Sequence, residues 1–77
     1  MVVGFIFIKT ESKMEIKTFR ALNRIKEITE LTPLFGEYDL LAKVEASDFN
    51  HLSVVILKKI RKVPGVIETQ TLPGVKI

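Results

Sequence analysis

The chain contains no cysteine, one histidine, and only four glycines and three prolines among its 77 residues. Without cysteine there are no disulfide bonds, thiolate nucleophiles or thiolate metal sites. The glycines stand alone, so the sequence has no glycine-rich loop of the kind that holds a phosphate. No apolar stretch approaches the roughly 20 residues of a membrane span, and the apolar start lacks the basic leader of a secretion signal. These absences favour a cytoplasmic protein that uses no cofactor.

Candidates for catalysis are equally scarce. His51 has no metal-binding partner near it in the sequence, and we expect it to be an exposed residue in the first turn of a helix. Two pairs of carboxylates, Glu27 with Glu30 and Glu37 with Asp39, have spacings that arise often by chance at solvated strand ends. The sequence therefore predicts neither a catalytic site nor a metal site.

The composition is that of one small globular domain. Hydrophobic residues make up 47% of the chain, and 12 basic against 9 acidic residues give a net charge of +3. A charge of this size suits solubility and says little about partners. A chain of this length buries only roughly 60% of its unfolded surface, so its own core is marginal. Association with another subunit would add burial.

The first predicted strand, residues 2–9, is apolar at both odd and even positions. Val3, Phe5 and Phe7 face one way, and Val2, Ile6 and Ile8 face the other. A half-solvated antiparallel strand would alternate apolar and polar residues instead. The chain has two helical patterns, which can cover one face of a sheet, so a second subunit is needed on the other face. We therefore expect an obligate oligomer.

The first helix is predicted from a capping box, in which Ser12 is followed three residues later by Glu15. We expect it to end near Lys26 or Glu27. Its broad apolar face comprises Met14, Ile16, Phe19, Ala21, Leu22 and Ile25.

Period-two patterning then predicts a strand over residues 28–35, with Leu31 on the face opposite Ile28. Pro33 places this strand at a sheet edge, because proline cannot donate a ladder hydrogen bond. A hairpin turn at residues 36–39 leads into a strand at residues 40–46. Leu40, Ala42, Val44 and Ala46 form the apolar face of that strand, opposite Leu41, Lys43 and Glu45.

Ser47 or Asp48 is predicted to cap the second helix, which Pro64 and Gly65 end. The apolar stripe of this helix is Phe49, Leu52, Ile56, Ile60 and Val63. A last strand is expected at residues 66–72, and Pro73 and Gly74 should weaken its continuation. The order βαββαβ predicts the α+β ferredoxin-like fold, a four-stranded antiparallel sheet with both helices on one face.

Two surface features have competing interpretations. The basic run at residues 58–62 could bind nucleic acid or an acidic protein, yet cations are also favourable in the last turn of a helix. We favour the second interpretation. Val54 and Leu57 point away from the apolar stripe of the second helix, which weakly suggests another oligomer contact.

The hairpin and its flanks resemble a known family. The segment GEYDLLAKV at residues 36–44 closely resembles a signature of the Lrp/AsnC regulators, the leucine-responsive and asparagine-synthesis family. VPGV at residues 63–66, ETQT at 68–71 and FIFIKT at 5–10 also match. The resemblance covers only the effector half of that family, the RAM domain named for regulation of amino acid metabolism. The chain is similar to a stand-alone RAM domain over residues 1–77, without the usual helix-turn-helix domain.

The resemblance implies dimers whose sheets pack face to face, as in dimeric α+β barrels, through Val3, Phe5, Phe7 and Leu41. It also implies that dimers assemble into a ring. Small effectors, typically amino acids, are then expected between dimers near the hairpin, at Gly36, Tyr38, Asp39, Thr69 and Thr71. We hypothesise that Asp39 meets the effector's ammonium group while backbone amides of the turn meet its carboxylate. Gly36 and Asp39 can equally be explained as residues that build the hairpin.

The leading function is thus a non-catalytic module that binds an amino acid effector and oligomerises. It would act on transcription or metabolism through a protein partner such as a full-length Lrp/AsnC regulator, without binding nucleic acid directly. The alternative is a small dimeric α+β barrel enzyme, a cofactor-free isomerase or oxygenase, whose cavity Lys43 and Glu45 could enter. A nucleic-acid binder that uses residues 58–62 is the third possibility.

Overall fold

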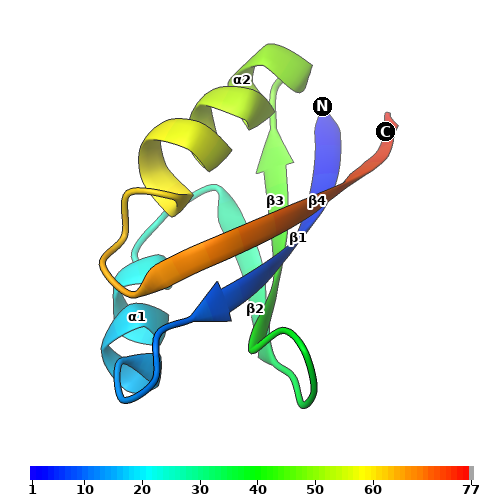
Figure 1. Ribbon diagram of the computed structural model, residues 1–77. Coiled ribbons are helices and arrows are strands. Elements are labelled where there is room, and N and C mark those ends of the chain that lie inside the picture. Colours follow the sequence, from blue (N-terminus) through cyan, green and yellow to red (C-terminus); the bar gives the residue numbers. More distant parts are fainter. Residues whose placement is uncertain (77) are drawn as a thin grey trace.

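The computed structural model describes residues 1–76, and side chains as far as Leu72. In chain order its elements are β1 (Val2–Thr10), α1 (Glu15–Leu22), β2 (Ile28–Pro33), β3 (Leu40–Ala46), α2 (Phe49–Val54), the π-helical segment η1 (Val55–Ile60) and β4 (Val66–Lys76). The four strands form one antiparallel sheet in the order β2-β3-β1-β4, with α1, α2 and η1 against it (Figure 1). The predicted ferredoxin-like fold is confirmed. No helix within residues 1–76 is long and apolar enough to cross a membrane.

The hydrophobic core lies between the helices and one face of the sheet. Its fully buried side chains include Val2, Ile6, Ile8, Leu22, Val44, Val55 and Ile60. Gly4 brings β1 directly under α2, because a Cβ atom there would lie 2.9 Å from Leu52 Cδ2. Gly65 similarly lets α1 approach the segment before β4. Its φ is +95°, and Thr18 Oγ1 donates a hydrogen bond of 2.9 Å to Pro64 O.

The opposite face of the sheet has no helix over it. Phe5 lies there between Lys43 of β3 and Leu72 of β4, and Phe7 lies between Leu41 and Gln70. Phe5 is 37% exposed and Leu72 is 46% exposed, whereas Val3 is already buried within one chain. This open face therefore combines apolar centres with polar neighbours, and it is the surface on which the sequence predicts a second subunit.

The first helix differs from its prediction at both ends. It begins at Glu15 after Met14, and no side chain caps it, so the capping box of Ser12 and Glu15 does not form. The cause is a tight turn in which Met14 N donates to Glu11 O at 3.0 Å and Lys13 adopts a φ of +73°. At the other end, short hydrogen-bonded turns replace the helix after Leu22.

Two further predictions failed because a local insertion changes which side chains face the core. In β2 a register shift between Ile28 and Glu30 places both Ile28 and Leu31 against the core, although strict alternation put them on opposite faces. In the second helix, Leu52, Ile56, Ile60 and Val63 of the predicted stripe do pack in or against the core, but Phe49 is 49% exposed and Val55, which the stripe omitted, is fully buried.

The other boundaries are close to those predicted. Asp48 caps α2 by accepting a 2.7 Å hydrogen bond from His51 N. β2 is an edge strand, as Pro33 predicted. β4, however, continues to Lys76 through Pro73 and Gly74, with a register irregularity opposite Val2 and Gly4. A proline is tolerated there because β4 is the other edge strand.

Candidate functional site

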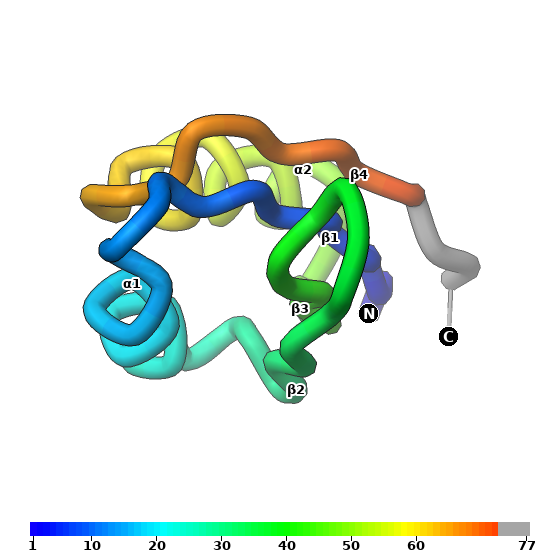
Figure 2. Tube along the Cα trace, turned by 60° about the horizontal axis from the view of Figure 1, so that its bottom comes forward, coloured from blue at the N-terminus to red at the C-terminus, as the bar shows by residue number. Residues whose placement is uncertain are grey.

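The hairpin between β2 and β3 lies at the same end of the molecule as α1 (Figures 1 and 2). Asp39 fixes the base of this hairpin. Its Oδ2 atom accepts a hydrogen bond from Thr10 N at 2.7 Å, its backbone N–H donates to Ile8 O at 2.9 Å, and its carbonyl accepts from Leu34 N at 2.8 Å. Asp39 therefore has the structural role that was one of its two predicted interpretations.

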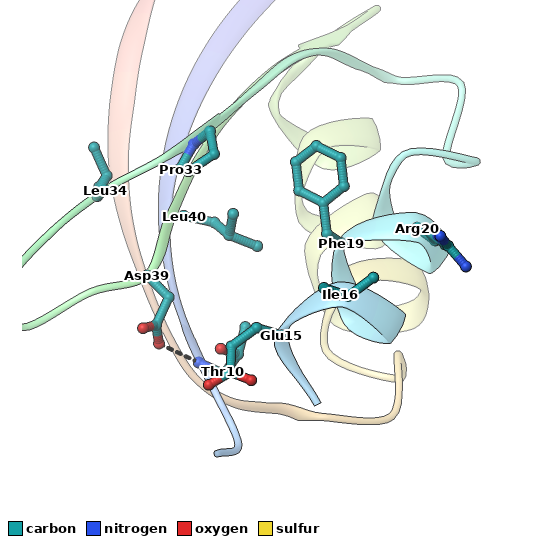
Figure 3. Close-up of a pocket in the computed structure, with 9 residues that line it drawn as sticks. All are labelled: Thr10, Glu15, Ile16, Phe19, Arg20, Pro33, Leu34, Asp39 and Leu40. Atoms are coloured by element: carbon teal, nitrogen blue, oxygen red, sulfur yellow. Dashed lines mark hydrogen bonds between the residues drawn. The ribbon is translucent and has the colours of Figure 1, made fainter. Parts of the chain in front are cut away.

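The carboxylate of Asp39 also borders a pocket of about 490 Å³ between α1 and the hairpin, here called the hairpin pocket. Figure 3 shows the carboxylates of Asp39 and Glu15 on either side of Thr10, with Arg20 on the far side of Phe19. Its other lining side chains are Ile16, Pro33, Leu34 and Leu40. The pocket thus has apolar walls and two carboxylates at one end, and the guanidinium of Arg20 points away from it (Figure 3).

Thr10 is the most unusual residue of this lining. It is only 7% exposed, and its Oγ1 atom has no hydrogen-bond partner. Leaving a buried hydroxyl unpaired costs free energy, because water is lost without replacement. Because the Oγ1 atom is fully buried in this structure, a ligand group or a water molecule would relieve that cost only after neighbouring side chains move.

Tyr38 points to the other side of the sheet. Its ring lies 5.6 Å from that of Phe7, centroid to centroid, and its hydroxyl is 3.0 Å from Glu68 Oε2 and 2.9 Å from Gln70 Oε1. The hydrogen bond with Glu68 raises the pKa of the Tyr38 hydroxyl above its ordinary value. Tyr38 therefore ties the hairpin to β4 across the open face.

Thr69 and Thr71 pair with Ile8 and Ile6 of β1, so they face the helices. They line a separate groove of about 420 Å³ between β4 and the second helix, called here the β4 groove. Its other lining residues are Phe49, Leu52, Ser53, Ile56, Leu57 and Arg61. Within one chain the structure therefore does not bring the two threonines to the hairpin.

Gly36 lies at the tip of the hairpin, with a φ of +111° and nothing within 4 Å of the place a Cβ would occupy. The neighbouring Phe35 is fully exposed. Of the five predicted effector residues, one lines the hairpin pocket, two line the β4 groove, and Gly36 and Tyr38 line neither.

Sequence reasoning missed Thr10 and Glu15 as pocket residues. The signal for Thr10 was present, since it continues the core-facing series of Ile6 and Ile8 and is the first polar member of it. Glu15 was interpreted as part of a capping box. Its position beside Thr10 follows from the turn that delays the start of α1.

A second polar cluster lies where the loop after α1 meets α2 and η1. Glu27 is 6% exposed and accepts hydrogen bonds from Lys59 Nζ at 2.9 and 3.0 Å, and His51 Nε2 lies 3.3 Å away. Bonding to Lys59 holds the pKa of the Glu27 carboxyl below its ordinary value of 4.5, although burial acts in the opposite direction. His51 Nδ1 accepts from Ser47 N at 3.0 Å, which leaves Nε2 to donate to Glu27.

This cluster joins the loop after α1 to α2 and η1. His51 is partly buried by it, where the sequence predicted a simply exposed residue. Within residues 1–76 no three His, Asp or Glu side chains gather as metal ligands would. The cluster is thus a structural link between the two helical segments.

Comparison with known proteins identifies the family. A family model described as the Lrp/AsnC ligand binding domain matches residues 3–76. The structure is similar to that of FFRP-DM1 with a TM-score of 0.92 and 35% identity, over 97% of this chain and 100% of that chain. It is similar to AsnC from E. coli with a TM-score of 0.90 and 27% identity, over 99% of this chain and 52% of that chain.

A curated relative is an enzyme. The chain is 39% identical over 69 residues to homocitrate synthase from Sulfurisphaera tokodaii, and this covers 88% of the chain but only 15% of that protein. The match to the family model extends over nearly the whole chain and agrees with the fold and with the hairpin sequence. The chain belongs to the Lrp/AsnC ligand-binding domain family.

Proposed function

We propose that the chain is a non-catalytic module of the cytoplasm that binds an amino acid effector, oligomerises, and regulates transcription or amino acid metabolism through a protein partner. The observation that carries this proposal is the hairpin pocket, where two carboxylates and an unpaired hydroxyl meet apolar walls. Family membership supports a ligand-binding role.

The chemistry of the hairpin pocket suits a small molecule with an ammonium group and an apolar side chain. Asp39 and Glu15 offer negative charge to the ammonium, and Thr10 Oγ1 offers a further hydrogen bond once the side chains that bury it move. Phe19, Leu40 and their apolar neighbours would contact the side chain. Backbone amides of the hairpin would then bind the effector's carboxylate.

The open face of the sheet supports a homodimer. Phe5 and Leu72 are partly exposed at its centre and edge, and a second copy packed face to face would remove both from water. Lys43 and Glu45 lie on the same face, so they would be enclosed in the dimer opposite the partner's equivalents.

The β4 groove and the hairpin tip support a further contact between dimers. Phe35 at the tip is fully exposed, and Phe49 and Leu57 in the groove are about half exposed. The hairpin tip lies at the opposite end of the molecule from α2, which forms the groove with β4 (Figure 1). A tip can therefore fill a groove only in another copy. Such a head-to-tail contact generates a ring where the rotation between successive copies closes and an open filament where it does not, and we propose the ring. In that assembly Thr69 and Thr71 of one copy would approach the hairpin of the next.

Two kinds of protein partner fit this module. A full-length Lrp/AsnC regulator could share the same ring, because its ligand-binding half would present a similar interface. The match to part of homocitrate synthase favours a second candidate, in which the module controls a metabolic enzyme rather than a DNA-binding protein.

Calorimetric titration with a panel of amino acids tests effector binding. We expect at least one apolar amino acid to bind, and Glu15→Gln and Asp39→Asn each to weaken it roughly tenfold, the effect of losing a charged hydrogen-bond partner. The matched variant Thr69→Val/Thr71→Val separates the two possible locations. It has no effect if the effector lies within the hairpin pocket of one chain, and weakens binding if the effector lies between copies. Absence of binding across the panel would contradict the proposed function.

A further inference from the structure

Positive charge gathers on one side of α1. Residues 12–26 contain five basic residues and one acidic residue, a net charge of +4, and they form one of two basic segments, the other being residues 58–62 with four basic residues and no acidic one. Four of the cations, Lys13, Lys17, Arg20 and Arg24, line a single shallow hollow of about 530 Å³ with Ile16 and Ala21. Lys17 and Arg20 are in α1, Lys13 lies in the turn before it and Arg24 in the turn after it, and all four border the same hollow. We call these four residues the basic stripe.

The basic stripe is unpaired and accessible. All four cations are exposed, and the ion pairs found in the described part of the chain involve Lys59 and His51 with Glu27 instead. α1 lies on the helical side of the sheet, so a second copy on the open face would leave the stripe uncovered (Figure 1).

Helix stability does not explain this arrangement. The four cations border one hollow, so their like charges repel one another. Cations near the start of a helix also oppose its dipole, and Lys13 and Lys17 are at that end. Lys13 is in addition held at a φ of +73°, a conformation that is costly for a residue with a Cβ atom. The repulsion among the cations and their opposition to the helix dipole are both reduced if an anionic partner covers the stripe.

Ile16 indicates which anionic partner fits. Its side chain is 71% exposed within the hollow formed by the basic stripe. A phosphate backbone offers no apolar group to cover Ile16. An amphipathic protein segment supplies both carboxylates and an apolar side chain.

We propose that the outer face of α1 is a docking surface for an acidic, amphipathic segment of a protein partner, whose carboxylates pair with the basic stripe and whose apolar side chain covers Ile16. A helical segment with acidic residues at spacings of four, three and four, laid along α1, satisfies both conditions. Ile16 and Arg20 also line the hairpin pocket, so the docking surface shares a wall with the proposed effector site.

The test uses a fluorescein-labelled helical peptide with glutamates at that spacing and one leucine between them, measured by fluorescence anisotropy against the whole chain. We expect binding that weakens with added salt, and Lys17→Glu/Arg24→Glu to weaken it roughly tenfold. The control is Lys58→Glu/Lys62→Glu, which makes the same change in net charge on η1 and the turn after it. We expect the control to stay within about twofold of the unmodified chain, since Lys58 and Lys62 do not line the hollow of the basic stripe. Circular dichroism verifies that both variants are folded.

Three results would overturn the proposal: equal weakening by both double variants, equal binding of a peptide with the same composition but scrambled glutamates, or tighter binding of duplex DNA with the same dependence on Lys17 and Arg24. The last result would assign the basic stripe to nucleic acid. Lys17 and Arg24 do not line the hairpin pocket, so effector titration of the same variants reports on the proposed function separately.

Discussion

The two helical segments differ in how firmly the rest of the chain holds them. α2 and η1 have a side-chain cap from Asp48, bury Leu52, Val55 and Ile60, and are linked to the loop after α1 through Glu27. α1 has no side-chain cap and leaves Ile16 exposed. Yet α1 lines the hairpin pocket and carries the basic stripe. Stability therefore resides mainly in the second segment, whereas the candidate binding surfaces gather on the first.

The largest expected effect comes from truncating one isoleucine in each segment. Ile60→Ala should lower the free energy of unfolding by about 3 kcal/mol, because a fully buried side chain leaves a cavity. Ile16→Ala should change it by less than about 0.5 kcal/mol, since Ile16 is mostly solvated. Urea denaturation at one fixed protein concentration measures both. Similar losses for the two variants would contradict the proposed difference between the segments.

A smaller effect is expected from the link between the segments. Glu27→Gln should cost about 2 kcal/mol at neutral pH, because Lys59 and His51 lose a buried anionic acceptor. The lowered pKa of Glu27 means that its stabilising contribution is present above the ordinary value of 4.5 and is lost as the pH falls through the lower value of the folded chain.

The measurement is urea denaturation of the unmodified chain and of Glu27→Gln between neutral and acid pH. The two free energies of unfolding should converge as the pH falls. A difference between the two free energies that stays constant across that pH range would contradict the stabilising role of ionised Glu27.

The smallest effect compares the two helix starts. Asp48→Ala should cost about 1 kcal/mol, because the side chain that accepts from His51 N is removed. Ser12→Ala should change stability by less than about 0.5 kcal/mol, because Ser12 caps nothing. Thermal unfolding followed by circular dichroism ranks the two. A loss for Ser12→Ala equal to that for Asp48→Ala would mean that the capping box forms after all.

The fold was predictable because each core-facing series is regular over a whole strand. Ile6 and Ile8 of β1 face Ala42 and Leu40 of β3, as simple alternation requires. Prediction failed where one inserted residue changed that period, at the bulge in β2 and in η1. Neither the bulge nor the π-helical turn can be predicted from the local sequence, because the packing of the neighbouring element decides whether the extra residue is tolerated.

The candidate site was predictable only in part. Asp39 could be singled out from the hairpin sequence, and the structure places it on the hairpin pocket. Thr10 and Glu15 come from β1 and α1, far from the hairpin in the chain, and no local pattern joins them to it. The opposite orientations of Tyr38 and Thr69 likewise follow from strand register across the sheet.

The sequence by itself determined the order of the elements, the apolar first strand and the hairpin, because these depend on residues close together in the chain. Tertiary structure alone decided that Thr10 would be buried without a partner, that Glu27 would meet Lys59, and that four cations would share one hollow on α1. The physical reason is that pairing, burial and charge clustering depend on distances in space, and those are set only when the helices pack on the sheet.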